Sequence, residues 1–431
     1  MSFISPYQDS GINKIIQAYS DDHDAVFCYG AGLYGKIVGA FLLENDISME
    51  GYIVSDDVEP DMSVLGLPLY SAKEKLPKLK NNSGVIVAVN ENLQSDIVSF
   101  LEKNNITDYL CIKNTWIPIL RDSCDFTRRY ESMNNITVIC YHRVANIPID
   151  TWKLAVKPEL FEDQIRYLKE NYLILRSDEE WNIAEGKRAA IITFDDGYED
   201  SYTELLPILE KYQVPATVFV ATCNLDSNKE FWWDELERII SFANESVTKI
   251  RRFGLDIPIA SACEKEKACY QIHPYLKKMD HKERDKWLRK LADELDASKE
   301  RSYCHSLTSL QLRELSNSPL ITIGGHTITH SSLAMETLDE QRWEIVESKK
   351  VIESIIRKPI EVFSYPFGQK SDFSDETVEV AIKAGFKKVF AAYDGIANSQ
   401  YKNGYIPRIN IGQELELDAS IRLLNYYETI Y

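Results

Sequence analysis

The sequence has a deficit of positive charge and lacks a long apolar run. Lys and Arg number 49 against 67 Asp and Glu, and the formal net charge is -18. Such a charge repels nucleic acid phosphates and anionic lipid headgroups at long range. The most apolar stretch, residues 25–43, is interrupted by four glycines and a lysine, so it does not resemble a membrane span. We therefore expect no nucleic acid partner and no transmembrane segment.

Signals for secretion and for disulfide formation are also missing. The first 20 residues contain no basic segment followed by an apolar one, which is the pattern of a secretory signal. The 8 cysteines include no C-x-x-C pair, and a chain of 431 residues is too large to need disulfides for stability. We expect a cytoplasmic protein with reduced thiols.

The chain is long enough for two or three domains, and its first part alternates strands with helices. Apolar and β-branched runs predict strands over 25–29, 51–55 and 84–89, with helical patterns over 36–44 and 93–103. This βαβ alternation predicts a small Rossmann-like domain over residues 1–122. A more polar stretch, 123–134, is the expected linker.

The second part, residues 135–431, repeats the alternation with more strands. Six apolar runs predict buried strands, at 136–141, 189–194, 216–221, 320–323, 362–365 and 388–391. Helical patterns separate most of them, which predicts an α/β fold with an open parallel sheet or a β/α barrel. Residues 226–317 have helical spacing and are far too long for a connecting loop, so they predict a helical insertion.

Polar residues that can carry out chemistry follow four of these runs directly. The parallel strands of a barrel end on one face, where active sites are built, so these residues should become neighbours. They are His142, the pair Asp195 and Asp196, the pair His326 and His330, and the Pro-Phe-Gly turn around Phe367.

Two histidines and a carboxylate are a common ligand set for a catalytic divalent metal. The His-x-x-x-His spacing places His326 and His330 on one face of a helical turn. A second carboxylate beside the metal can take the proton of a water that attacks a carbonyl. Each motif alone has a structural interpretation, because Asp-Asp-Gly and Pro-Phe-Gly are common turns and paired histidines are common at surfaces. Their conjunction after four strands favours the site.

These motifs resemble those of a known family. Thr-Phe-Asp-Asp-Gly (193–197), Gly-His-Thr-Ile-Thr-His (325–330) and Tyr-Pro-Phe-Gly (365–368) resemble the first three motifs of the polysaccharide deacetylases, which are the NodB-homology group or carbohydrate esterase family 4. The resemblance covers about residues 135–431, with the insertion outside the common core. It implies a distorted β/α barrel and a metal-dependent hydrolase that removes acetyl groups from a carbohydrate.

The resemblance also assigns roles to individual residues. It makes Asp195 the general base and makes Asp196, His326 and His330 the ligands of a divalent metal, with zinc preferred. Phe367 would offer its backbone N-H to the oxyanion.

Two departures from the family pattern concern the residues around the base and the acid. Ser364 stands where many members have an arginine, and no histidine follows His330 to act as the usual acid. His142, in Cys-Tyr-His-Arg-Val, resembles the early Tyr-His motif of the circularly permuted, poly-N-acetylglucosamine deacetylase branch, in which the acid comes from the first strand. Arg408 is either the replacement for the missing arginine or an ordinary residue of the barrel rim.

The first part of the chain carries a separate motif. Gly30, Gly32 and Gly35 form a G-x-G-x-x-G between a predicted strand and helix, and Asp56 follows about 20 residues later, as in the dinucleotide fingerprint. This predicts a nucleotide or nucleotide-sugar with its phosphate at the helix N-terminus. The alternative is a Rossmann-like scaffold that binds no ligand or docks a partner.

The leading hypothesis is a cytoplasmic enzyme that removes N-acetyl groups from an amino sugar or oligosaccharide during surface polysaccharide biosynthesis. Its substrate could be lipid-linked or nucleotide-linked. The alternatives are an O-acetyl esterase on the same scaffold, a nucleotide-binding module with a degenerate barrel, and an NAD-dependent oxidoreductase.

Overall fold

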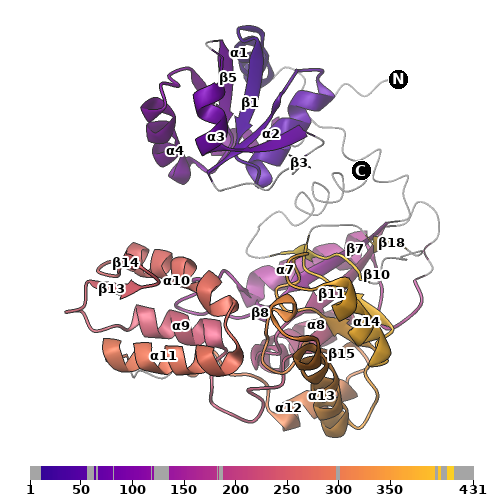
Figure 1. Cartoon of the computed structure of the whole chain (residues 1–431). Coiled ribbons are helices and arrows are strands. Elements are labelled where there is room, and N and C mark those ends of the chain that lie inside the picture. The colour runs from indigo at the N-terminus through magenta and orange to yellow at the C-terminus, as the bar shows by residue number, and fades with distance from the viewer. Residues whose placement is uncertain are drawn as a thin grey trace. The chain divides into compact units, whose positions relative to one another are not determined.

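The computed structural model in Figure 1 divides into two compact units, one of residues 1–133 with 416–431 and one of residues 134–415. The structure describes residues 11–55, 63–64, 67–80, 82–117, 119–120, 135–181, 183, 188–297, 301–393, 397–398 and 405–411.

The first unit is built on a six-stranded sheet of order β3-β4-β2-β1-β5-β6. The strands are β1 (Ala25–Tyr29), β2 (Gly51–Val54), β3 (Ser63–Val64), β4 (Leu67–Ser71), β5 (Ser83–Val87) and β6 (Tyr109–Cys111). All neighbours pair in parallel except β3 with β4. The helices are α1 (Gly11–Asp21), α2 (Leu33–Glu44), α3 (Ala72–Lys75) and α4 (Glu91–Lys103). The three strands and two helices predicted here are confirmed.

Both faces of this sheet are buried, which explains why its strands are continuous apolar runs. Val26 and Cys28 of β1 belong to one apolar cluster, together with residues of α2. Phe27 and Tyr29 point to the other face and belong to a second cluster, together with Leu101 of α4.

The second unit is built on a parallel sheet whose strands match the six predicted runs. They are β7 (Asn135–Tyr141), β11 (Ala189–Phe194), β12 (Ala216–Val220), β15 (Ile321–Gly325), β16 (Val362–Ser364) and β17 (Lys388–Phe390), in the order β17-β16-β15-β12-β11-β7. Three short strands are added to it: β10 (Leu173–Ile174) beside β11, and β18 (Ala397–Asn398) and β19 (Ile409–Asn410) beside β7.

Residues 405–411 join the two edges of this sheet. Ile406 forms a parallel bridge with Phe390 of β17, and the amide of Ala391 donates to the carbonyl oxygen of Ile406 at 2.8 Å. A few residues later β19 pairs in parallel with β7, and the amide of Ile411 donates to Cys140 at 3.0 Å. The sheet therefore curls into a ring, and the predicted distorted β/α barrel is confirmed.

The helices of the barrel are α7 (Pro158–Asn171), α8 (Leu206–Tyr212), α12 (Ser309–Asn317), α13 (Leu338–Ile356) and α14 (Asp375–Lys383). Their first residues explain where several of them begin. Thr308, Thr337 and Ser374 each cap a helix with a reciprocal side-chain and backbone exchange. Two short strands after β7, β8 (Arg143–Val144) and β9 (Ala155–Val156), pair with each other and enclose a loop.

The predicted helical insertion is present and has its own core. It contains α9 (Trp232–Ser241), α10 (Ala262–Lys277) and α11 (His281–Leu295), which lie together in salmon beside the barrel of the same unit (Figure 1). It also contains a hairpin that the helical pattern did not predict, β13 (Lys249–Arg252) and β14 (Leu255–Pro258). Phe253 and Gly254 both have positive φ, which is the conformation of a tight two-residue hairpin turn.

Two expectations from the composition can be compared with the structure. The seven cysteines within the described residues are all free thiols. None of the described helices is both long and apolar enough to cross a bilayer.

Candidate active site

A pocket of about 1070 Å³ lies where the barrel strands end. The six residues predicted to carry the chemistry of the barrel all line it: His142, Asp195, Asp196, His326, His330 and Phe367. The convergence expected from parallel strands therefore occurs.

Asp196, His326 and His330 come together as a compact set of ligand atoms. Asp196 Oδ1 lies 3.5 Å from His326 Nε2 and 3.3 Å from His330 Nε2, and all three ligand atoms lie within 4.8 Å of one another. Ligands about 2.1 Å from a tetrahedral ion are about 3.4 Å apart, so the observed separations fit one ion between the three atoms. All three side chains are buried, as a preformed site requires.

The backbone around these ligands has an unusual conformation. Asp196 and Gly197 both have positive φ, and the amide of Ala221 donates to the Asp196 carbonyl oxygen at 3.0 Å. A non-glycine residue with positive φ is strained, and this strain commonly occurs at functional sites. The tight bend directs the Asp196 carboxylate into the pocket.

The expectation that His326 and His330 lie on a helical turn is wrong. They lie on an irregular bend after β15, in which Thr327 and His330 have positive φ. The amide of His330 donates to Thr327 Oγ1 at 3.1 Å, and this bond closes the bend. Side chains four residues apart can therefore converge without a helix, because the bend reverses the chain.

Hydrogen bonds and burial set the state of the two imidazoles. His326 Nδ1 lies 2.8 Å from the Ser364 carbonyl oxygen, so it donates there and leaves Nε2 to face Asp196. Burial opposes a charge on His326, but Asp195 and Asp196 outweigh it and raise its pKa. Burial lowers the pKa of His330 to about 4, which keeps that ring neutral at physiological pH.

Asp195 is held from behind by Arg408, which is completely buried. Arg408 Nη1 donates to Asp195 Oδ1 at 2.7 Å and Nη2 donates to Oδ2 at 2.6 Å, which is a bidentate pair. Arg408 Nη2 also donates to Ser364 Oγ at 2.7 Å. The arginine therefore reaches Asp195 from the residue directly before β19, and the small Ser364 side chain leaves room for it.

This environment keeps Asp195 ionised. Burial alone would raise its pKa, but Arg408 and His326 outweigh burial and lower it. Ser364 Oγ and Cys140 Sγ approach Asp195 Oδ2 at 3.3 and 3.6 Å as further donors. The carboxylate is thus charged and oriented beside the three ligand atoms.

His142 lies half-buried close to Asp195. A nitrogen of its ring lies within 4.8 Å of a carboxylate oxygen of Asp195 and of Cys140 Sγ. Phe367 has a positive φ, and its ring lies 4.8 Å from that of His330. Both residues therefore line the same pocket as the ligand set, and their roles as acid and oxyanion donor stay predictions.

One wall of the pocket comes from residues that the sequence did not single out for this site. Trp152 and Lys277 line it, and so does His273, whose ring is 5.9 Å from that of Phe367. Lys277 Nζ pairs with Asp372 at 2.5 Å and lies 4.2 Å from the Phe367 ring centre. His273 and Lys277 belong to α10 of the insertion, whose docking against the barrel no local pattern reveals.

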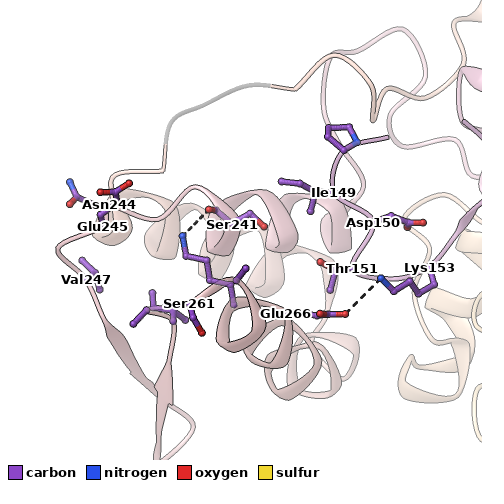
Figure 2. A pocket seen from close by; sticks show the side chains of 15 residues that line it. Ile149, Asp150, Thr151, Lys153, Ser241, Asn244, Glu245, Val247, Ser261 and Glu266 are labelled. Atoms are coloured by element: carbon purple, nitrogen blue, oxygen red, sulfur yellow. Dashed lines mark hydrogen bonds and ion pairs between the residues drawn. The ribbon is translucent and has the colours of Figure 1, made fainter. Parts of the chain in front are cut away.

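A second pocket, of about 700 Å³, lies on the other side of the loop between β8 and β9 (Figure 2). The two pockets share Pro148, Asp150 and Lys153 of this loop. Lys153 Nζ lies 3.8 Å from Glu266 Oε1 of α10, and Figure 2 shows this pair at the rim. The second pocket is therefore adjacent to the catalytic pocket and is bounded partly by the insertion.

The glycine motif of the first unit forms a tight strand-to-helix turn. Gly30 has a φ of +112°, and a Cβ on Gly35 would meet the Gly30 carbonyl oxygen at 1.9 Å, so both positions require glycine. Gly32 is the N-cap of α2 and has open space around its Cα. Asp56, the acidic residue of the fingerprint, lies outside the described residues.

Residues 182–389 match the family model for polysaccharide deacetylase. This part of the chain belongs to the polysaccharide deacetylase family. His142 and Arg408 lie outside the matched range, one before it and one after it, although His142 lines the pocket and Arg408 pairs with Asp195 of its lining.

Individual relatives are distant in sequence. The chain is 22% identical over 278 residues to YxkH of Bacillus subtilis, which its name assigns to the polysaccharide deacetylases, covering 62% of this chain and 68% of that protein. It is 29% identical over 89 residues to the poly-beta-1,6-N-acetyl-D-glucosamine N-deacetylase of Escherichia coli, covering 19% of this chain and 13% of that protein.

Solved structures of similar proteins include a polysaccharide deacetylase from Bacillus cereus and IcaB from Ammonifex degensii. The first has a TM-score of 0.44 and 19% identity, covering 67% of this chain and 69% of that one. The second has a TM-score of 0.43 and 16% identity, covering 69% and 98%.

Proposed function

We propose that the protein is a metal-dependent deacetylase that removes N-acetyl groups from an amino sugar in a surface glycan or its precursor. The observation that carries this proposal is the ligand set of Asp196, His326 and His330 with the ionised Asp195 beside it. Family membership of residues 182–389 supports the reaction class.

The residues of the pocket supply the remaining parts of an amide hydrolysis. A divalent ion held by Asp196, His326 and His330, with zinc preferred, would polarise the acetyl carbonyl and activate water. Asp195 accepts the proton of the attacking water, and Arg408 fixes the orientation of its carboxylate. The backbone N-H of Phe367 donates to the carbonyl oxygen as negative charge develops there. His142 then gives a proton to the departing sugar nitrogen.

The size of the pocket supports an oligosaccharide rather than a single sugar. The second pocket shares Pro148, Asp150 and Lys153 with the catalytic pocket, and this adjacent space offers room for neighbouring sugar units. An O-acetyl ester uses the same carbonyl chemistry and remains the alternative substrate. Hydrolysis of an ester needs less help from an acid, so the role of His142 distinguishes the two.

The experiment that tests the proposal measures metal content and acetate release together. The full-length protein should contain about one divalent ion per chain and release acetate from acetylated glucosamine oligomers, and chelation should abolish the release. His326→Ala and Asp196→Asn should lose the ion and the activity. Asp195→Asn should keep the ion and lose about 10²-fold or more in turnover, which is the scale of general-base catalysis.

Matched controls separate these roles from loss of fold. Asp339→Asn, on the exposed first turn of α13, should retain both the ion and the turnover. Full turnover in chelated protein would contradict the metal-dependent mechanism. Loss of the ion in Asp195→Asn with retention in Asp196→Asn would exchange the roles of the two carboxylates.

A further inference from the structure

A third pocket, of about 920 Å³, lies in the insertion and is distinct from the catalytic pocket. Residues of α9 and α11 line it, together with segments around 223–231 and 301–305. The Trp232 side chain lies between the two pockets, because its ring centre is 4.9 Å from that of His273 and 4.8 Å from the Arg284 guanidinium carbon.

Arg284 forms part of the wall of this pocket, and its charge is not neutralised by an ion pair. Only 2% of the residue is exposed, and Nη2 donates to the Thr329 carbonyl oxygen at 3.1 Å. Nε and Nη1 have no hydrogen-bond partner among the described residues, and no carboxylate in that part of the chain lies within ion-pair distance. Burial lowers the pKa of Arg284 by more than the nearby Asp285, Glu344 and Glu336 raise it.

The other charged residues of the pocket leave a positive excess. Five Lys and Arg residues line it, Lys229, Arg238, Arg284, Arg289 and Arg301, against three carboxylates, Glu230, Glu235 and Asp285. Arg238 and Arg301 are paired, since each lies 2.9 Å from an oxygen of Glu230.

Five cations against three carboxylates leave a formal excess of two positive charges on the lining, which the pairing of Arg301 with the buried Glu237 reduces to one, while His281 and His305 add two further nitrogen atoms to the wall. In a chain of net charge -18, a concave surface with this balance concentrates anions rather than cations. Lys229 and Arg289 are exposed, and Arg289 Nε donates to the Asp285 carbonyl oxygen at 3.2 Å, whereas Arg284 is buried and held by its bond to Thr329.

We propose that this pocket binds an oxyanion of the phosphate class, as a free ion or as a phosphate ester. Arg284 supplies a fixed, desolvated charge at the wall, and Lys229 and Arg289 supply exposed donors at the rim. A phosphate or pyrophosphate carries enough charge to offset the excess, and its oxygens match several N-H donors at once.

Binding here is linked to the catalytic pocket through one hydrogen bond. Thr329, whose carbonyl oxygen accepts from Arg284, precedes His330 in the chain. An anion bound to Arg284 would therefore alter the hydrogen bond that Arg284 donates to Thr329, which belongs to the bend that carries His330. The proposal does not depend on the deacetylase reaction, because anion binding is measured without turnover.

The test is calorimetry on the full-length protein with inorganic phosphate and pyrophosphate at low ionic strength. Arg289→Gln, on an exposed side chain, should weaken pyrophosphate binding by at least threefold, and Arg284→Gln should weaken it by tenfold or more. Lys286→Gln, which removes an exposed charge from the same helix without lining the pocket, is the matched control and should bind as the wild type does.

The same titrations separate the two sources of the anion. Displacement of pyrophosphate by N-acetylglucosamine 1-phosphate, but not by N-acetylglucosamine, would support a phosphate ester as the ligand. Binding of the inorganic ions alone, with the same sensitivity to Arg289→Gln, would support a free ion. The proposal would be overturned if the wild type bound neither ion, or if Arg289→Gln and Lys286→Gln weakened pyrophosphate binding equally. Both outcomes can be measured even if Arg284→Gln does not fold.

Discussion

At the scale of single residues, the base is controlled by an arginine that is distant from it in the sequence. Arg408 and Asp195 are 213 residues apart, yet they form a bidentate pair in the buried wall of the barrel. Ser364 accepts a hydrogen bond from the same guanidinium, so a small side chain in the third motif and a large one directly before β19 fill one space together. Each of these residues explains the presence of the other.

Replacing Arg408 with lysine should move the acid limb of the pH-rate profile. Arg408 lowers the pKa of Asp195, and lysine keeps the charge but cannot make the bidentate pair. The pKa of Asp195 should therefore rise toward its usual value or above it, because burial remains, and activity should be lost at a higher pH as the medium is acidified. Turnover measured from pH 4 to 9 tests this, with Ser364→Ala as a control that retains the ion pair and shifts the limb less.

His142→Ala tests the proposed acid by comparing two substrates. An amine leaves only when protonated, and imidazole has an ordinary pKa near 6.5, which suits a proton donor. The variant should keep its metal and fold, lose most amide hydrolysis, and lose much less activity on an activated aryl ester whose leaving group needs no proton. Equal losses on both substrates would show that His142 is not the acid.

At the scale of elements, the strands were predictable because buried parallel strands are continuous apolar runs. All six runs of the barrel and all three of the first unit correspond to observed strands. The hairpin of β13 and β14 was not predictable from the same signal, because only Ile250 and Ile257 of its eight strand residues are buried and they form no continuous apolar run. The site residues that follow strands were predictable too, because the end of each apolar run marks the end of a strand.

The remaining parts of the site depend on contacts between distant elements, which a local pattern does not contain. His273 and Lys277 reach the catalytic pocket only because α10 docks against the barrel. The pairing of Arg408 depends on where β19 joins β7. The bend that carries His326 and His330 has the spacing of a helix without its geometry, so spacing alone gave the correct partners and the wrong conformation.

Helix α9 contains an acid that should make stability depend on pH. Burial raises the pKa of Asp234 from 3.8 to about 7, although Arg143 and a 2.6 Å hydrogen bond from Tyr198 favour the charged form. Between these two pH values the folded protein retains a proton that the unfolded chain has lost, so stability falls as the pH rises through this window. Asp234→Asn removes the effect and keeps an acceptor for Tyr198.

Between pH 4 and pH 8 the free energy of unfolding of the wild type should therefore fall relative to that of Asp234→Asn. The fall should be at most about 4 kcal/mol. Urea denaturation at a series of pH values, in chelator, measures it. Asp293→Asn, on an exposed position of α11, serves as the control and should show no such shift. A pH-independent difference for Asp234→Asn would mean that this acid titrates alike in both states.

At the scale of the whole molecule, two units with separate cores divide the chemistry between them. The ligand set, the base and the proposed acid all belong to residues 134–415, whereas the glycine turn belongs to the first unit. Hydrolysis of an amide requires no nucleotide. We propose that the first unit holds the nucleotide part of a substrate or of a regulatory ligand, at the N-terminus of α2.

A single position in the first unit allows this proposal to be tested without loss of the fold. Gly32 is the N-cap of α2, and a side chain there meets nothing within 4 Å. Aspartate is among the best N-cap residues, so Gly32→Asp should keep or raise the stability of the helix. Its carboxylate would occupy the place of a phosphate and repel it, so binding of uridine or adenine nucleotides and their sugar conjugates, measured by calorimetry on the full chain, should fall by tenfold or more.

Gly32→Ser provides the same cap without the charge and should bind within a few-fold of the wild type. If the wild type gives no heat with any of these ligands, the glycine turn is a structural scaffold; equal binding by Gly32→Asp would place the ligand away from α2.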